Sequence, residues 1–422
     1  MLTMADDLRP GARIALLVPG TEAYVDLVIA LLADGVFPVP LDPQLSEAER
    51  DRVLAPIAPD LVVTTRDDVD RLLEPRRHLS RSLPLGRPVH CTSGTTGTPK
   101  GVWSGLLDTD DAEALLTEER DLWAFRADDV NLVLSPLHHS APLRFAMGTL
   151  LAGGRILVPG RFDPVRVTAA IRSARPTTMF CVPTHLQRLF AYWDDTGVPD
   201  LSSFRLVAHA GAPCPPAVKR RLLDLFPAGS TWEFYGSTEG QFTACPSEEW
   251  LEHPGTVGRA RPGRTLSTDD DGRIWCAVPA HARFSYLGAP EQTAAAWRAT
   301  PDGPAFTVGD VGRIDADGWV HLDGRRTDLV ISGGVNVYPL EVENALREVP
   351  GVVDVAVFGV ADPDWGQRLC AAVVGEVRAD VLDAHARRVL SAAKRPKQYV
   401  SVDALPLTPT GKVLRDHLPA LL

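Results

Sequence analysis

A ten-residue segment near residue 100 combines glycine, hydroxyl and lysine residues in a pattern suited to binding phosphate. It reads Thr92-Ser93-Gly94-Thr95-Thr96-Gly97-Thr98-Pro99-Lys100-Gly101. Glycines let the backbone approach an anion closely, hydroxyl and amide groups donate hydrogen bonds to phosphate oxygens, and Lys100 adds a positive charge. The spacing is not that of a Walker loop, because no Ser or Thr follows the lysine. We predict a phosphate loop of another type, with a solvated surface turn as the simpler alternative.

Three later segments carry residues that suit the rest of a nucleotide. In Tyr235-Gly236-Ser237-Thr238-Glu239, an aromatic ring suits a base and a carboxylate beside a hydroxyl suits a cation that bridges phosphates. Asp310 follows Thr307-Val308-Gly309, and a carboxylate pairs well with the two hydroxyls of a ribose. Lys412 ends the segment Leu407-Thr408-Pro409-Thr410-Gly411-Lys412. Each segment alone has a simpler interpretation, as a turn or as ordinary surface charge.

Taken together and in this order, the segments resemble the motifs of the adenylate-forming enzymes, the superfamily of acyl-CoA synthetases, nonribosomal adenylation domains and luciferases. The resemblance implies that ATP and Mg²⁺ activate an acid as its adenylate, with release of pyrophosphate and then AMP. It implies catalytic roles for Lys100, His139, Thr238, Glu239 and Lys412, with Glu239 as the magnesium ligand. The implied cofactor-binding residues are Thr92, Ser93, Gly94, Thr95, Thr96, Gly97, Lys100, Gly211, Ala212, Pro213, Tyr235, Gly236, Ser237, Thr238, Asp310, Arg325, Gly333 and Gly334.

Two segments bear on the step after adenylation. Pro136-Leu137-His138-His139-Ser140-Ala141-Pro142 resembles the acid-pocket motif of fatty-acid and aryl CoA ligases, which makes His139 a candidate gate. Its alternative is a hydrogen-bonded core imidazole. Ser332-Gly333-Gly334-Val335-Asn336 resembles the lining of a pantetheine tunnel, and its alternative is a tight turn.

Coenzyme A is therefore favoured as the acceptor of the acyl group. The alternative is a biosynthetic enzyme with another acceptor, either a carrier-protein thiol or an amine, including nitrite activation for diazotisation of an aryl amine. A non-catalytic relative is disfavoured, because Glu239, Asp310 and Lys412 are all present. Trp103 and Arg144 stand near the phosphate loop and the acid pocket. If Arg144 faces that pocket, a second anionic group on the substrate is favoured.

The elements that must position these residues follow an alternating pattern of strands and helices. Apolar segments at residues 14–18, 36–41, 131–135, 155–158, 177–181 and 205–209 predict strands. Ser46 with Glu49, and Asp163 with Pro164, predict helix starts. This pattern is typical of an α/β fold with helix-covered, mostly parallel sheets.

We predict two domains. Residues 1–325 form a large nucleotide- and acid-binding domain, and residues 326–422 form a small, mobile α+β domain that carries Lys412, with Thr327 at the hinge. The phosphate loop begins earlier in this chain than in typical relatives, so the N-terminal subdomain is predicted to be reduced, or completed by a second copy in a homodimer.

Composition limits the partners. The chain has 422 residues, 45% of them hydrophobic, and a formal net charge of −11, which disfavours a broad nucleic-acid surface. No segment reads as a signal peptide or membrane span. Six cysteines lie far apart, without the spacing of a zinc site or a disulfide framework. We therefore expect a cytoplasmic enzyme that acts on a small-molecule acid.

Overall fold

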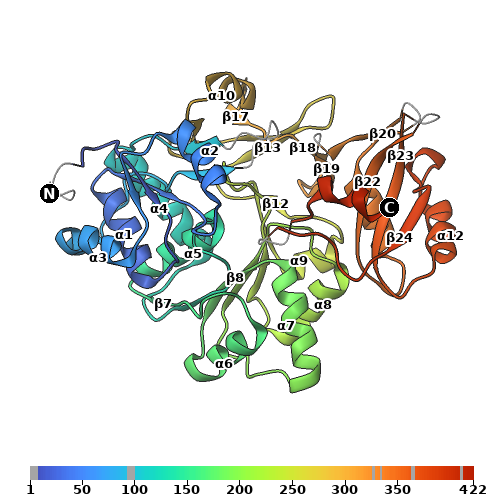
Figure 1. Ribbon diagram of the computed structural model, residues 1–422, viewed down its shortest axis with the longest axis horizontal. Coiled ribbons are helices and arrows are strands. Elements are labelled where there is room, and N and C mark those ends of the chain that lie inside the picture. The colour runs from blue at the N-terminus through green and yellow to red at the C-terminus, as the bar shows by residue number, and fades with distance from the viewer. Residues whose placement is uncertain (1–7, 93–99, 326–327, 333–334, 363–365, 409–411) are drawn as a thin grey trace.

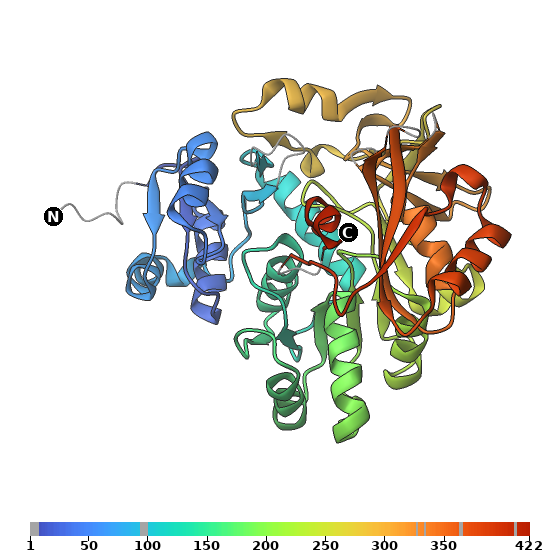
Figure 2. The same ribbon diagram turned by 45° about the vertical axis from the view of Figure 1, so that its right-hand side comes forward.

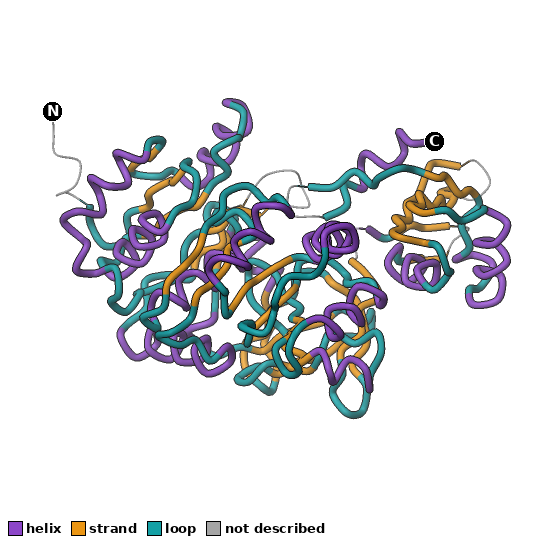
Figure 3. The backbone as a smooth tube through the Cα atoms, turned by 90° about the horizontal axis from the view of Figure 1, so that it is seen from below, coloured by secondary structure: helices purple, strands orange, loops and turns teal. Residues whose placement is uncertain are grey.

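The computed structural model describes residues 8–92, 100–325, 328–332, 335–362, 366–408 and 412–422. The N-terminal layer and the C-terminal unit lie at opposite ends of the long axis, with the central sheet between them (Figures 1 and 3). None of the helices within these ranges is long and apolar enough to cross a lipid bilayer.

The N-terminal layer is a three-stranded parallel sheet with the order β2-β1-β3. Its strands and helices are β1 (Arg13–Leu16), α1 (Glu22–Ala33), β2 (Phe37–Pro40), α2 (Glu47–Ile57), β3 (Leu61–Val63) and α3 (Arg66–Leu73). Helix α2 begins with the predicted capping box, in which the side chains of Ser46 and Glu49 each bond the other's backbone. The strand–helix–strand pattern expected for residues 14–41 is confirmed.

The central sheet has seven strands in the order β12-β11-β10-β9-β8-β6-β7. Five of them, from β10 to β7, are parallel. The strands are β6 (Val130–Val133), β7 (Arg155–Leu157), β8 (Thr178–Cys181), β9 (Leu206–His209), β10 (Thr231–Glu233), β11 (Thr243–Pro246) and β12 (Arg259–Ala260). All four strands predicted between residues 131 and 209 are therefore confirmed within two residues at each end.

Helices cover both faces of this sheet. The helices are α4 (Thr109–Trp123), α5 (Ser140–Leu151), α6 (Pro164–Ala174), α7 (Pro183–Thr196), α8 (Pro216–Leu225) and α9 (Ser247–Glu252). Side chains alternate along a strand, so Met179 packs with α6 and α7 on one face while Phe180 packs with Trp123 and Phe145 on the other. Helix α5 packs against both the central sheet and the N-terminal layer, because its Leu143 and Leu150 belong to the core of that layer.

Antiparallel strands make up the remaining sheets of the large unit. They form the sheets β15-β5-β4, β13-β14-β17-β16 and β18-β19. Their bounds, with that of α10, are β4 (His90–Thr92), β5 (Lys100–Trp103), β13 (Thr265–Thr268), β14 (Ile274–Ala277), β15 (Ser285–Tyr286), α10 (Pro290–Ala296), β16 (Trp297–Thr300), β17 (Gly303–Phe306), β18 (Asp310–Ile314) and β19 (Val320–Arg325). The sequence pattern predicted parallel layers and did not reveal this part of the fold.

The C-terminal unit is a five-stranded sheet with two helices. Its elements are β20 (Val330–Ser332), β21 (Val335–Val337), α11 (Pro339–Arg347), β22 (Val352–Asp362), β23 (Gly366–Gly375), α12 (Ala379–Val389) and β24 (Gln398–Ser401). The buried residues that pack together here run from Val330 to Leu390, so the unit has a hydrophobic core of its own. In Figure 2 this unit, orange to red, comes forward beside the strands of the large unit.

Candidate active site

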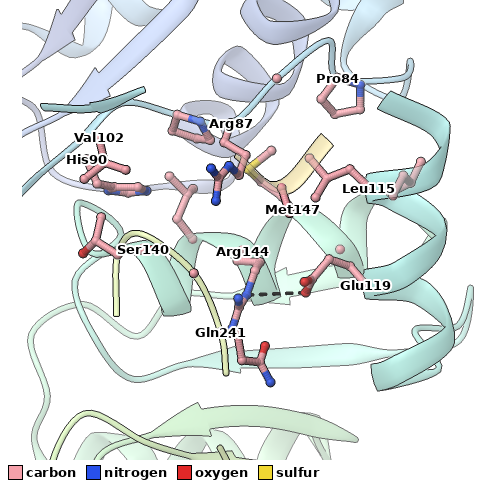
Figure 4. A pocket seen from close by; sticks show the side chains of 18 of the residues that line it. Pro84, Arg87, His90, Val102, Leu115, Glu119, Ser140, Arg144, Met147 and Gln241 are labelled. Carbon is pink, nitrogen blue, oxygen red and sulfur yellow. Dashed lines mark ion pairs between the residues drawn. The ribbon is translucent and has the colours of Figure 1, made fainter. Parts of the chain in front are cut away.

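A cavity of about 140 Å³ lies between α4, α5, the segment that leads into β4 and the segment that follows β10 (Figure 4). Ser140, Leu143, Arg144, Met147, Gly148 and Leu151 line it from one face of α5, because residues three and four apart in a helix point the same way. Since a buried water needs roughly 10–15 Å³ of such space, the cavity holds on the order of ten waters or a small organic acid.

One wall of this cavity depends on a close contact at a glycine. A Cβ atom at Gly148 would lie 2.3 Å from the ring of Phe125, so only glycine lets α5 approach that ring. The other walls are mostly apolar, with Leu115, Val278 and Phe306 among them. Uncharged polar groups enter at Ser140, Ser237 and Thr238, and charged side chains gather in one part of the cavity. An apolar chamber with a few polar groups is typical of a small-molecule site.

The predicted nucleotide residues meet at the carboxyl edge of the central sheet. Gly211, Ala212 and Pro213 follow β9, and Tyr235 follows β10, the parallel neighbour of β9. The Tyr235 hydroxyl donates a 2.7 Å hydrogen bond to Oδ2 of Asp310, and both residues are buried. Asp310 opens β18 directly opposite Arg325, the last residue of β19. Ligands of open α/β sheets bind at this edge.

The predicted metal ligand has a partner that the sequence did not reveal. The Tyr286 hydroxyl donates a 2.8 Å hydrogen bond to Oε1 of the buried Glu239. Lys100 Nζ lies 5.1 Å from the centre of the same tyrosine ring. Burial, with the charge of Glu239, raises the pKa of Tyr286, which therefore remains a hydrogen-bond donor. Tyr286 thus lies between the predicted phosphate lysine and the predicted metal carboxylate.

These groups suit a magnesium ion only if phosphate supplies further ligands. The described ranges contain no group of three His, Cys, Asp or Glu side chains placed to bind a metal. Mg²⁺ commonly takes one or two carboxylates, with water and substrate phosphates completing its octahedron. Glu239, beside Thr238 on the wall of the cavity, provides such a single carboxylate.

His139 lies at the N-cap of α5, with its ring centre 4.2 Å from that of His138. Its buried Nε2 has no hydrogen-bond partner among the described residues. His139 is therefore not the fully hydrogen-bonded core histidine that was the alternative to a gate. Burial, with the charges of His138, His90 and Lys412, lowers the pKa of His139 to about 3. The ring is therefore neutral, and the charge of Lys412 contributes to this shift.

A cluster of charged side chains surrounds the far part of the cavity. Arg144 Nε lies 3.5 Å from Oε2 of Glu119, and Arg261 bonds the other oxygen of Glu119 at 2.9 Å (Figure 4 shows the first pair). Arg264 binds both oxygens of Glu118, at 3.1 and 2.8 Å. Burial alone would raise the pKa of each glutamate, but the arginines outweigh it and the pKa of both is lowered. Arg144 lines the cavity, as required for the expectation that the substrate carries a second anionic group.

Several predicted residues lie outside the described ranges or have another role. Ser93, Gly94, Thr95, Thr96, Gly97, Gly333 and Gly334 are outside them, although Thr92 and Lys100, at either end of the loop, are paired across β4 and β5. Trp103 packs edge-on against Phe37, 5.8 Å between ring centres, in the N-terminal core. It is therefore a packing residue.

Sequence reasoning missed Tyr286, Arg87, Glu118, Glu119, Arg261 and Arg264. Adjacent acidic residues on a helix, as at positions 118 and 119, ordinarily indicate a solvated face. One sequence signal could have pointed to the glutamates. Arg144 was expected near the pocket, and a buried arginine needs a carboxylate partner.

Comparison with known families matches this geometry. Residues 89–275 match the AMP-binding enzyme family, and residues 341–412 match the AMP-binding enzyme C-terminal domain. The chain belongs to the AMP-binding enzyme family. Among its relatives, a feruloyl-CoA synthase of an Amycolatopsis species is 35% identical over 457 residues, covering 98% of this chain and 89% of that protein. A long-chain-fatty-acid–CoA ligase of Mycobacterium tuberculosis is 30% identical, covering 97% and 88%.

Solved structures of this AMP-binding family share the whole fold. The crystal structure of ATP-bound MatB from Rhodopseudomonas palustris superposes with a TM-score of 0.79 at 28% identity, covering 98% of this chain and 89% of that one. The amide bond synthetase McbA from Marinactinospora thermotolerans gives a TM-score of 0.80 at 28% identity, covering 98% and 90%. The α/β fold class, with a large N-terminal and a small C-terminal part, is thus confirmed.

Proposed function

We propose that this AMP-binding enzyme activates a small carboxylic acid with ATP and then transfers the acyl group to coenzyme A. The observation that carries the proposal is that Thr238 lines the acid cavity. The same short segment bears Tyr235, bonded to Asp310, and Glu239, bonded to Tyr286. A nucleotide held at Tyr235 and Asp310 therefore directs its phosphates to the mouth of the cavity.

In the first step, an oxygen of the substrate carboxylate attacks the α-phosphorus of ATP. The bond from that phosphorus to the bridging oxygen breaks, and pyrophosphate leaves with the electron pair. A carboxylic acid is ionised at neutral pH, so no proton has to move, and catalysis consists of positioning and charge stabilisation. Lys100, Thr238 and Lys412 are proposed to stabilise the charge on the transferred phosphorus. The apolar walls keep water from the mixed anhydride.

Glu239 is proposed to bind the magnesium ion that accompanies ATP. A magnesium ion there would neutralise part of the phosphate charge. The Tyr286 hydrogen bond holds one carboxylate oxygen of Glu239 and leaves the other available for coordination. Outer partners of this kind orient metal ligands and tune affinity. We therefore assign Tyr286 a positioning role.

In the second step, the thiolate of coenzyme A attacks the acyl carbon, the bond to the AMP oxygen breaks, and AMP leaves. His139 is proposed to act as a gate between the acid cavity and the incoming thiol. Its pKa of about 3 makes it too weak a base to hold a proton near neutral pH. Its Nε2 has no partner in the described parts of the chain, and we propose that it forms a hydrogen bond with the acyl group or the thiol instead.

We further propose that residues 326–422 form a mobile domain that alternates between the two steps. The separate core from Val330 to Leu390 supports this division. The charge of Lys412 contributes to the lowered pKa of His139 in the present arrangement, which supports a position near the acid site. Transfer would need a rotation about the region of Thr327 that brings Gly333 and Gly334 to the thiol path. All three residues lie outside the described ranges.

A second candidate function uses another acceptor. The similarity to an amide bond synthetase, with a TM-score of 0.80, supports an amine acceptor as strongly as the fold supports a thiol. A carrier-protein thiol and nitrite activation for diazotisation belong to the same alternative. A carrier protein and a second copy of the chain stay predictions as partners.

ATP–pyrophosphate exchange tests the first step without any acceptor. A panel of fatty acids, aryl acids, dicarboxylic acids and nitrite is assayed, and we expect exchange with at least one carboxylic acid. The active acid is then incubated with coenzyme A, an amine or a carrier protein, and we expect AMP release to accelerate with coenzyme A. Exchange with nitrite alone would refute carboxylate activation, and acceleration by an amine alone would favour the second candidate. Gly333→Trp is expected to keep exchange and block thioester formation.

A further inference from the structure

One part of the acid cavity carries more positive than negative charge. Four arginines and one glutamate line it, and a second glutamate pairs with two of these arginines: Arg87, Arg144, Arg261, Arg264, Glu119 and Glu118. Even with both glutamates counted, two positive charges in this cluster lack a compensating carboxylate. Burying a charge without a partner costs several kcal/mol, so an excess of this kind calls for a ligand.

The pairing shows which arginines are left over. Glu118 accepts two hydrogen bonds from Arg264, and Glu119 accepts its short bond from Arg261. Arg144 forms a 3.5 Å ion pair with Glu119 and lies 5.3 Å from the centre of the Phe234 ring, but its buried Nε forms no hydrogen bond within the described chain.

Arg87 is the second cation without a carboxylate of its own. It donates at 3.1 and 3.0 Å to the backbone carbonyls of Glu239 and Arg283, and no carboxylate of the described ranges lies within ion-pair distance of it. Burial, followed by the repulsion of Arg264 and Arg144, lowers the pKa of Arg87 to about 10. The positive charge therefore comes from several side chains that line one cavity, and Figure 4 shows Arg87 and Arg144 among them, with Arg144 paired to Glu119.

Of these two arginines, Arg144 lies along α5 from the reacting end, whereas Arg87 bonds the backbone of Glu239, next to Thr238. His139 occupies the N-cap position of α5, and Arg144 follows five residues later on that helix. At 1.5 Å per residue, the two backbone positions lie about 7.5 Å apart along the axis. The reacting carboxylate is needed near Thr238 and Lys412, so it cannot also neutralise Arg144.

We propose that the substrate is a short dicarboxylic acid, whose second carboxylate binds Arg144, displaced along α5 from the carboxylate that is adenylated. This inference rests on the proposed function and narrows its substrate class. Arg144 keeps 26% of its side chain accessible, because it faces the cavity. A planar carboxylate suits a guanidinium fork, and the apolar walls at Leu143 and Met147 suit the linking carbons.

Matched pairs of acids test the inference in ATP–pyrophosphate exchange with the full-length protein. The pairs are hexanedioate with hexanoate and para-carboxycinnamate with cinnamate, so each pair differs by one carboxylate. A hydrogen-bonded buried charge contributes about 1.5–3 kcal/mol, so we expect kcat/KM to favour the diacid by at least about tenfold in one pair. A wild-type ratio at or below one in both pairs overturns the proposal.

Variants show whether Arg144 supplies the preference. Arg144→Met is expected to lower the diacid-to-monoacid ratio by about tenfold or more, and Arg144→Lys is expected to keep part of it, since the charge remains but the fork is lost. Arg120→Met is the matched control, because Arg120 is an exposed arginine on the neighbouring helix α4, and its ratio should equal that of the wild type. A ratio that Arg144→Met leaves unchanged overturns the assignment.

The outcomes separate this inference from the function on which it rests. If no acid supports exchange, the adenylation itself is refuted. If monocarboxylic acids support exchange better than their diacid partners, adenylation stands and the second carboxylate site is wrong. If Arg144→Met fails to fold, as judged by thermal melting, the diacid-to-monoacid ratios of the wild type and of Arg144→Lys decide whether Arg144 binds the second carboxylate.

Discussion

The hydroxyl of Tyr286 is the group whose removal tests the magnesium site most directly. Tyr286→Phe deletes one oxygen and keeps the ring near Lys100, so it removes the 2.8 Å hydrogen bond to Glu239 with little change in packing. The Glu239 carboxylate then loses the contact that fixes its orientation. We expect the variant to bind the metal more weakly while the nucleotide and acid sites keep their shape.

The magnitude follows from the type of bond. A hydrogen bond to a charged acceptor contributes about 1.5–3 kcal/mol. Tyr286 is only half-buried, so water can replace the lost hydroxyl and the low end of that range applies. About 1.5 kcal/mol corresponds to roughly a tenfold weaker metal affinity, within the range found when outer partners of metal ligands are removed.

The assay is ATP–pyrophosphate exchange at fixed ATP with varied free Mg²⁺. We expect the Mg²⁺ concentration that gives half-maximal rate to rise about tenfold, and most of the rate to return at saturating Mg²⁺. Tyr192→Phe is the matched control, since it deletes the same atom from a half-buried tyrosine of α7. An unchanged half-maximal concentration with a lower maximal rate would show that Tyr286 does not act through the metal, and would refute the reasoning.

Three further perturbations have defined outcomes. Lys412→Ala should slow adenylation by about a hundredfold or more, because a charge-stabilising donor is lost, and single-turnover adenylate formation at the wild-type rate would contradict its role. Gly148→Ala should lower the urea midpoint, because a Cβ 2.3 Å from Phe125 costs about 1–3 kcal/mol of strain, more than the roughly 1 kcal/mol gained in helix propensity; an unchanged midpoint would show that the ring moves freely. Burial, with Arg188, lowers the pKa of His185 to about 4, so the unfolded chain binds its proton first and the stability present above pH 6.5 is lost as pH falls toward 4, by about 1.4 kcal/mol per pH unit. His185→Phe should flatten the pH dependence of the free energy of unfolding by that slope, and an unaltered slope would exclude His185 as a source of acid instability.

Part of the fold was predictable because its signals are local. The capping box of Ser46 and Glu49 and the Asp163 cap of α6 each involve residues three apart. The apolar strands of the parallel layers are short continuous segments, and they appear within two residues of the predicted positions. The antiparallel strands after residue 243 were not predicted, because strand pairing depends on partners that lie elsewhere in the chain.

The sequence by itself determined the nucleotide chemistry, since Tyr235, Thr238 and Glu239 stand in one short segment whose residue types suit base, phosphate and metal. Only the tertiary structure decided which groups support them and what else the cavity binds. Glu239 and Tyr286 are 47 residues apart, and Glu119 and Arg261 are 142 apart. From the sequence alone, a charged residue is expected on the solvated surface, and only the fold shows that it is buried. Burial then makes its pairing, or its lack of a partner, the property that selects the ligand.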